Sequence, residues 1–389
     1  MKIAILSMQR VINYGSVLQA YSLKKLIEDI TNEPVDFIDP ILENTLSVDM
    51  PVRDSDDYVK KDEYGVWLFR NIRKFFDKLN YKKLTKEIIG FQENELGMSY
   101  SYDPHEKKYD LVIEGSDEVF KASDKLYLHM YGAVDNAETL ITYAAACGST
   151  SIKGLNEKNR ATVKALMKKY KCISVRDEHT YNYIKSLYDG RIDRHLDPVL
   201  VGGLCKRKHK VVALKETQLS VTIDVHDKNV KLKNYMIVYA YGNRIRDRKE
   251  IEAIKDYAKK RNLQTIALGA PQFWCDKFLI VSPLEVLDYF YHADCVVTDT
   301  FHGSIFSIIN KCNFVTILRK SNENKLGGLL KQLKLEDRIV DDVDNLPEML
   351  EKNIDYSKVD EILDKERIRA RKYLVEQIES IKDKNDLLM

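Results

Sequence analysis

The sequence of 389 residues lacks any long apolar run. A membrane-spanning helix needs about 18 or more consecutive, mostly apolar residues, and no segment approaches that length. The first residues, MKIAILSMQR, are apolar over only about six positions, which is too short for the core of a secretory signal peptide. We therefore expect a soluble protein that acts in the cytoplasm.

Metal-binding and redox cysteine patterns are also missing. The six cysteines form no CxxC pair and have no ligand spacing with histidine. Cys172, Cys295 and Cys312 lie in or beside apolar runs, where a thiol packs as a small hydrophobe. The pattern predicts reduced, structural cysteines and no metal site. His195, His209 and His226 have no ligand spacing either, so we interpret them as structural.

An excess of one charge sign is absent as well, since 62 Lys and Arg oppose 60 Asp and Glu. A net charge of +2 gives no general attraction to nucleic acid, which we therefore exclude as a partner. The chain contains neither the GxGxxG fingerprint of dinucleotide-binding proteins nor the GxxxxGK[ST] loop that binds nucleoside triphosphates. We expect no cofactor.

What the sequence does contain is a regular alternation of short apolar strands with amphipathic helices. This alternation predicts parallel sheets covered by helices on both faces. It occurs twice along the chain, so the predicted fold is α/β with two Rossmann-like lobes that face a cleft. The second lobe has four predicted strands, YMIVYAY, LQTIALG, DCVVTD and NFVTILR.

The predicted domain boundaries follow the changes in this pattern. The N-terminal lobe covers 1–204 and includes a helical excursion at about 40–108, which is rich in Lys, Asp, Tyr and Phe. A connection at 205–234 leads to the C-terminal lobe at 235–345, and a helical tail follows at 346–389. The connection contains the basic run KRKHK at 206–210, which we interpret as a solvated linker or a weak tether to anionic lipid headgroups. Peripheral contact with the inner face of a membrane is thus the alternative to a purely soluble location.

In open parallel sheets, ligands bind beyond the carboxyl ends of the strands, and four polar clusters follow predicted strands here. The first cluster is Asn13, Tyr14, Gly15 and Ser16, at the start of a predicted helix. Backbone N–H groups at a helix start can bind an anion or a sugar hydroxyl. The alternative is an ordinary N-cap turn, with Asn13 or Ser16 as the capping residue.

The second cluster is Gly115, Ser116 and Asp117, with Glu118 next, directly after the strand YDLVI. Carboxylates at a strand end could orient sugar hydroxyls or act as a general base. A helix cap at Ser116 or Asp117 is the alternative interpretation.

The third cluster contains Arg176, which follows the strand at 172–175. Its planar guanidinium is suited to bidentate binding of phosphate or carboxylate. A salt bridge with Asp177 or another surface acid is the alternative.

The fourth cluster, TDTFHGS at 298–304, gives the strongest signal. It places His302 at a helix start beside Gly303 and Ser304. Histidine exchanges protons near neutral pH, and free N–H groups beside it can stabilise negative charge. Arg319 and Lys320 follow the next strand and either add positive charge to the same cleft or form a solvated surface pair.

Five segments in order carry a family resemblance: NYGSVLQAY at 13–21, GSDEVF at 115–120, SVRDE at 174–178, LDPVL at 196–200 and TDTFHGSIFSI at 298–308. With these, the chain resembles the polysaccharide pyruvyl transferase family over most of its length, most weakly in 40–105 and 205–233.

The resemblance implies a GT-B-like fold, similar to that of the two-lobed glycosyltransferases. It also implies transfer of pyruvate from phosphoenolpyruvate to two hydroxyls of one hexose, in a polysaccharide or a lipid-linked precursor, to give a cyclic ketal and phosphate. By the same resemblance, the family's proposed site residues fall on Arg176 and His302. The chain departs from the family at Glu118 and Phe120, where many members have Gln and Trp, and at Thr300, where some have Arg.

These residue types suit the implied chemistry. His302 would serve as the acid-base group, and Asp117 would orient a hydroxyl or act as a base. Arg176, with Arg319 or Lys320 in place of the arginine absent at Thr300, would bind the anionic donor, assisted by Gly303 and Ser304. The clusters at 13–16 and 115–116 would line the acceptor side of the cleft. Two alternatives remain open, a nucleotide-sugar glycosyltransferase on the same fold and a non-catalytic sugar-binding relative.

Overall fold

A computed structural model describes residues 1–48, 67–98, 107–122, 124–204, 216–217, 224–225, 232–242, 244–320 and 322–386. The basic run at 206–210, together with Cys205, His209 and His226, lies outside these residues.

The first lobe contains a six-stranded parallel sheet with strand order β2-β1-β4-β6-β7-β8. All four residues of its strand β1, IAIL, are buried, as expected for a strand covered by helices on both faces. Leu6, the last residue of β1, is aligned with Ile38 on one side and with Glu114 on the other, so the loops after these strands start at one edge of the sheet. The strands are β1 (Ile3–Leu6), β2 (Val35–Ile38), β4 (Tyr109–Glu114), β6 (Ala137–Thr142), β7 (Tyr170–Val175) and β8 (Ile192–Arg194).

The helices of this lobe begin at residues that suit an N-cap. Asn13 caps α1 and Asp177 caps α4, each with a side-chain oxygen that accepts a backbone N–H of the first turn. The helix α1 ends at Asn32 in the left-handed conformation, a common helix stop. The helices are α1 (Tyr14–Thr31), α3 (Glu157–Met167), α4 (Glu178–Lys185) and α5 (Pro198–Val201), with 3₁₀ turns at Leu128–Tyr131 and Ile152–Gly154.

The second lobe repeats this architecture with the strand order β13-β12-β11-β14-β15-β16, again all parallel. The central helix α8, FHGSIFSII, is mostly apolar and buried along its whole length. The strands are β11 (Tyr235–Tyr239), β12 (Gln264–Leu268), β13 (Lys277–Leu279), β14 (Cys295–Thr298), β15 (Phe314–Ile317) and β16 (Ile339–Val340). The helices are α6 (Arg248–Lys260), α7 (Pro283–His292), α8 (Phe301–Ile309), α9 (Glu323–Gln332) and α10 (Leu346–Glu351), with 3₁₀ turns at Glu336–Arg338 and Val343–Asn345. The predicted fold class, α/β with two Rossmann-like lobes, is confirmed.

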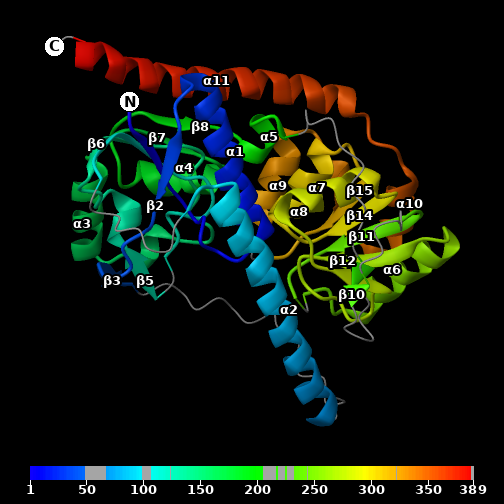
Figure 1. Cartoon of the computed structure of the whole chain (residues 1–389). Helices are drawn as coiled ribbons and strands as arrows, with labels where there is room; N and C mark the ends of the chain where they lie inside the picture. The colour runs from blue at the N-terminus through cyan, green and yellow to red at the C-terminus, as the bar shows by residue number, and fades with distance from the viewer. Residues whose placement is uncertain are drawn as a thin grey trace.

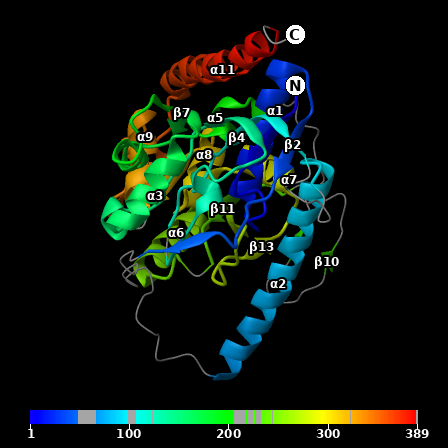
Figure 2. The same ribbon diagram turned by 90° about the vertical axis from the view of Figure 1, so that its left-hand side faces the viewer.

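Two short antiparallel pairs and one long helix lie outside these sheets. The pairs join β3 (Thr45–Ser47) with β5 (Lys125–Tyr127), and β9 (Glu216–Thr217) with β10 (Asp224–Val225). The long helix α2 (Trp67–Asn94) contacts α1 of the first lobe and α7 of the second with its C-terminal part, where Phe91 packs edge-on against Tyr21 at 5.4 Å between ring centroids. Figures 1 and 2 show its other end extending away from both lobes.

The predicted C-terminal helix, α11 (Tyr356–Asp386), joins the two lobes. Its first residue, Tyr356, donates a hydrogen bond to the carbonyl of Cys312 in the second lobe. Further along, the Tyr373 hydroxyl donates to the carbonyl of Thr142 in β6 of the first lobe. Figure 1 shows α11 running over the first lobe beside α1 and α5.

The apolar core continues from one lobe into the other. One cluster of buried residues includes Ile5 of β1, Leu18 of α1, Leu200 of α5, Phe306 of α8 and Leu374 of α11. The five described cysteines are buried and free, as small apolar residues would be (Cys147, Cys172, Cys275, Cys295 and Cys312). Within the described residues, no helix is long and apolar enough to cross a membrane.

Candidate functional site

His302 reaches from the second lobe to the surface of the first. It is the second residue of α8, whose N-cap Thr300 accepts the Gly303 N–H at 2.9 Å. Only 9% of His302 is exposed, and its Nε2 lies 3.5 Å from Oδ2 of Asp197 in the first lobe. A histidine at this interface is held by contacts from both lobes.

Arg176, at the end of β7, meets the same carboxylate. Its Nη1 lies 3.2 Å from Asp197 Oδ2 and 3.9 Å from Asp117 Oδ1. Its guanidinium carbon lies 4.2 Å from the ring centroid of Phe301, a cation–π contact across the lobes. Burial would lower the pKa of Arg176, but the carboxylates of Asp197 and Asp117 raise it, so the guanidinium is a firmly held cation. Its buried Nε has no hydrogen-bond partner among the described residues.

Asp117 connects this arginine with the start of α1. Ser16 Oγ donates to Asp117 Oδ2 at 2.7 Å, and Asn13 Oδ1 accepts the N–H groups of Gly15 and Ser16. The predicted capping role of Asn13 is thus observed, and the same residue also lines a pocket. Asp117 has a φ of 74°, a left-handed conformation that Asp tolerates better than most residues.

The loop before Asp117 is tied to the first lobe. The N–H of Ser116 donates to Gln19 Oε1, and the Ser116 carbonyl accepts the Ser7 hydroxyl. Gly115 has a φ of 118°, in a region that other residues rarely adopt. Gly115 and Ser116 therefore shape the loop that carries Asp117 at the carboxyl edge of the sheet.

Asp197 is the residue that sequence analysis missed. It is fully buried, accepts a hydrogen bond from Arg176 Nη1 at 3.2 Å, and lies 3.5 Å from His302 Nε2. Burial would raise the pKa of Asp197, but the hydrogen bond and charge of His302 and the charge of Arg176 lower it, so the carboxylate stays ionised. The segment LDPVL was noted in the sequence only as part of the family resemblance, because the two partners of Asp197 lie on other elements of the fold.

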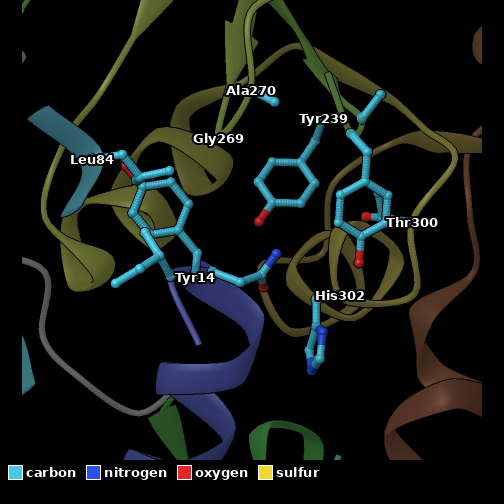
Figure 3. A pocket seen from close by; sticks show the side chains of 11 residues that line it. Tyr14, Leu84, Tyr239, Gly269, Ala270, Thr300 and His302 are labelled. Atoms are coloured by element: carbon cyan, nitrogen blue, oxygen red, sulfur yellow. The ribbon is translucent and has the colours of Figure 1, made fainter. Parts of the chain in front are cut away.

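Two pockets flank this cluster. The smaller, of about 150 Å³, is lined by His302, Thr300, Asn13 and a group of aromatic and small residues from both lobes. Figure 3 shows Tyr14, Tyr239 and His302 around it. The lining residues are Ile12, Asn13, Tyr14, Leu84, Tyr239, Ala240, Tyr241, Gly269, Ala270, Thr300 and His302.

The larger pocket, of about 490 Å³, lies on the side of Arg176 and Asp197 and is rich in cations. Among them is Lys325 of α9, whose Nζ binds Glu118 Oε1 of the first lobe at 2.7 Å. Burial would raise the pKa of Glu118, but Lys325 and Lys121 lower it well below its usual range. Sequence analysis did not select Lys325, because it considered polar residues directly after predicted strands and no strand directly precedes Lys325.

The structure gives Arg319 a different set of partners. Its Nη1 and Nη2 donate to the two oxygens of Glu250 at 2.7 and 2.9 Å, and its Nε lies 3.5 Å from Asp299. Burial raises the pKa of Asp299 to about 6, although Arg244 and Arg319 act in the opposite direction. Arg319 and the exposed Lys320 are absent from the described linings of both pockets.

Gly303 and Ser304 face the interior of the second lobe. A Cβ at Gly303 would lie 2.1 Å from Thr298 Oγ1, so only glycine fits between α8 and β14. The Ser304 hydroxyl bonds the Thr300 carbonyl and Thr316 Oγ1 and is fully buried. These two residues, predicted to bind the donor, position the start of α8. Tyr14 has its ring in the smaller pocket, while its hydroxyl donates to the Val281 carbonyl across the lobes.

Of the histidines interpreted as structural, His195 lies within the described residues and is buried. Its ring stacks on Tyr143, and its Nδ1 hydrogen-bonds Ser174 Oγ at 2.8 Å. No group of three or more metal-ligating side chains occurs in the described part of the chain.

Comparison with known proteins identifies the family of this chain. The sequence model of the polysaccharide pyruvyl transferases matches residues 13–321, which include Ser16, Asp117, Arg176, Asp197 and His302. The chain belongs to the polysaccharide pyruvyl transferase family. A search of curated proteins found no significant match.

Several solved structures resemble the fold at low sequence identity. UDP-GlcNAc 2-epimerase from Methanocaldococcus jannaschii is 12% identical, with a TM-score of 0.48 over 92% of this chain and 94% of that one. Sucrose-phosphate synthase from Thermosynechococcus elongatus is 12% identical, with a TM-score of 0.44 over the full length of both chains (100% and 100%). For a mutant O-GlcNAc transferase of Thermobaculum terrenum, the identity is 11% and the TM-score 0.43 over 98% of this chain, which spans 66% of that protein.

Proposed function

We propose that this protein transfers the pyruvyl group of phosphoenolpyruvate to two hydroxyls of one hexose in a polysaccharide or lipid-linked precursor, forming a cyclic ketal. The observation that supports it most is that Arg176 and His302, from different lobes, meet at Asp197 between two pockets, while Arg176 also pairs with Asp117. Family membership supports the same reaction class.

The donor would occupy the larger pocket. Phosphoenolpyruvate carries about three negative charges, one on its carboxylate and close to two on its phosphate. Arg176 offers a buried cation with an unpartnered Nε among the described residues, and Lys325 offers a second cation from the other lobe. Their charges would neutralise the donor and, later, the departing phosphate.

The acceptor would occupy the smaller pocket. Its walls are the rings of Tyr14 and Tyr239, with Asn13 and Thr300 among the polar groups. Flat apolar surfaces with a few polar side chains suit a sugar ring. Asp117, fixed by Ser16 and Arg176, would orient the attacking hydroxyl or accept its proton.

The reaction needs one acid and one base. The methylene carbon of phosphoenolpyruvate takes a proton, and a sugar oxygen forms a bond to the neighbouring carbon as that hydroxyl loses its own proton. The bond from this carbon to the phosphate oxygen breaks, and the second hydroxyl adds with loss of its proton. The products are the cyclic ketal and inorganic phosphate. His302 is the side chain suited to move these protons near neutral pH.

The direct test combines the protein with phosphoenolpyruvate and a panel of hexosides and lipid-linked sugars. We expect acceptor-dependent phosphate release, and a product heavier by one pyruvic acid less one water. The variant His302→Ala should lose about 10²–10⁴-fold in turnover while remaining folded. His292→Ala, which removes an exposed histidine at the end of α7, is the matched control and should keep its activity.

Two results would contradict the proposal. The first is protection from heat denaturation by UDP- or GDP-sugars and not by phosphoenolpyruvate, which would indicate a glycosyltransferase. The second is no phosphate release with any acceptor, which would indicate a non-catalytic relative.

A further inference from the structure

The two carboxylate oxygens of Asp197 have different partners. Oδ1 accepts the Val199 N–H at 3.0 Å and so caps α5. Capping needs one side-chain oxygen and no charge, and Asn or Ser would serve as well. Oδ2 faces away from this cap and lies 3.2 Å from Arg176 Nη1 and 3.5 Å from His302 Nε2.

We infer that Asp197 is a positioning residue for His302: its Oδ2 holds a proton on Nε2 of the imidazole, which leaves Nδ1 for proton exchange with substrate. The inference rests on the proposed function only for what His302 does with that proton. The orientation and charge of the ring are properties of the protein without substrate.

The surroundings of the ring support this assignment. Nε2 is buried and has no hydrogen-bond partner at ideal geometry among the described residues, and Asp197 Oδ2, 3.5 Å away, is the acceptor placed to take its proton. Nδ1 lies on the opposite side, against Gly15, which has no side chain to cover it. His302 also lines the smaller pocket, and Nδ1 is the ring nitrogen that does not face Asp197. An imidazole whose second nitrogen donates to a carboxylate is fixed in one tautomer.

The charges around the ring are few and unequal. On the first lobe, Asp197 faces Nε2, with Arg176 and Asp117 behind it, and Tyr14 of α1 lies beside the pocket. On the second lobe, Tyr239 of β11 and the start of α8 are the neighbours. Among these groups, Asp197 Oδ2 is the acceptor that faces Nε2, and Arg176, which lies against the same oxygen, competes for it.

Two variants should affect the tautomer of His302 differently. Asp197→Asn keeps an oxygen for the α5 cap but replaces the carboxylate, so the share of neutral rings that carry their proton on Nε2 should fall. Arg176→Gln removes the cation that competes for Asp197 Oδ2, so that share should not fall. A general loosening of the interface would lower the share in both variants.

The measurement is nuclear magnetic resonance of protein with ¹⁵N-labelled histidine and no substrate present. Loss of one signal in His302→Gln assigns the resonance. In the unmodified protein we expect the neutral ring to carry its proton on Nε2. Asp247→Asn is the matched control, since Asp247 caps α6 on an exposed surface and should leave the His302 tautomer unchanged.

The inference is overturned if the proton lies on Nδ1, or if Asp197→Asn leaves the tautomer of His302 unchanged. Should that variant fail to fold, the tautomers of the unmodified protein and of Arg176→Gln still decide the matter. None of these readouts uses pyruvyl transfer. An inactive protein with the expected tautomer would therefore contradict the proposed function and leave Asp197 in its role.

Discussion

Gly15 of α1 lies directly against the imidazole of His302, so that a Cβ at position 15 would stand 2.1 Å from Nδ1 and 2.3 Å from Cγ. Gly15 belongs to the first lobe and His302 to the second, and the contact is therefore part of the closed interface between them. Glycine is needed at this position because it has no side chain, and not because of a left-handed backbone, since φ of Gly15 lies outside that region.

We predict that Gly15→Ala displaces the His302 ring and reduces turnover by about the 10²–10⁴-fold expected for loss of an acid-base group. Gly90→Ala is the matched control, since nothing lies within 4 Å of a Cβ at Gly90 in α2. It should leave turnover unchanged and raise stability by about 0.5–1 kcal/mol. Steady-state kinetics and urea unfolding of both variants measure this. Normal turnover in Gly15→Ala would mean that the ring is free to move.

A second prediction concerns donor affinity. A hydrogen bond to a charged group contributes about 1.5–3 kcal/mol, or roughly 10- to 150-fold in affinity. Arg176→Ala should weaken phosphoenolpyruvate binding by about that factor, and Arg176→Lys should restore only part of it because the planar fork is lost. Calorimetric titration gives these affinities. Arg248→Ala, at an exposed surface pair, should bind the donor normally. Equal affinity in all three would place the donor elsewhere.

The third prediction separates stability from donor binding in the second lobe. Because both Nη atoms of Arg319 donate to Glu250, Arg319→Ala should lower the free energy of unfolding by about 1.5–3 kcal/mol. Phosphoenolpyruvate affinity should change little in Arg319→Ala and in Lys320→Ala. Urea unfolding and calorimetry of the two single variants test this. A tenfold loss of affinity in either would show that this pair replaces the arginine absent at Thr300, as the sequence suggested.

The fourth prediction is a pH dependence. Burial, assisted by Arg369 and Arg191, lowers the pKa of His195 to about 3. An unfolded histidine titrates near pH 6.5, so between about pH 6.5 and 3 the unfolded state binds the additional proton. The free energy of unfolding should therefore fall as the pH is lowered through this range, by up to about 1.4 kcal/mol per pH unit from this residue.

The variant His195→Gln removes that titration. Its free energy of unfolding, measured in urea at several pH values, should fall less steeply below about pH 6.5 than that of the unmodified protein. Parallel curves for the two proteins would show that His195 accepts a proton within the folded state.

Much of this protein could be predicted from local patterns. The buried strand IAIL, the cap at Asn13 and the apolar helix after His302 depend on residues close in sequence, so the α/β alternation and the two lobes follow from them. The rule that ligands lie beyond the carboxyl ends of parallel strands was enough to select Asp117, Arg176 and His302.

Only the tertiary structure decided which of these residues meet, and with what partners. The position of Asp197 before Pro198 is typical of a helix cap. It also contacts His302, because the packing of α8 on α5 brings that side chain to its second oxygen. Arg319 followed a strand like Arg176, yet Glu250 from α6 takes both of its Nη groups. Ion pairs of this kind form only where elements far apart in the chain come within a few ångströms of each other. Burial then strengthens the interaction of each pair. Local periodicity carries no information about those distances.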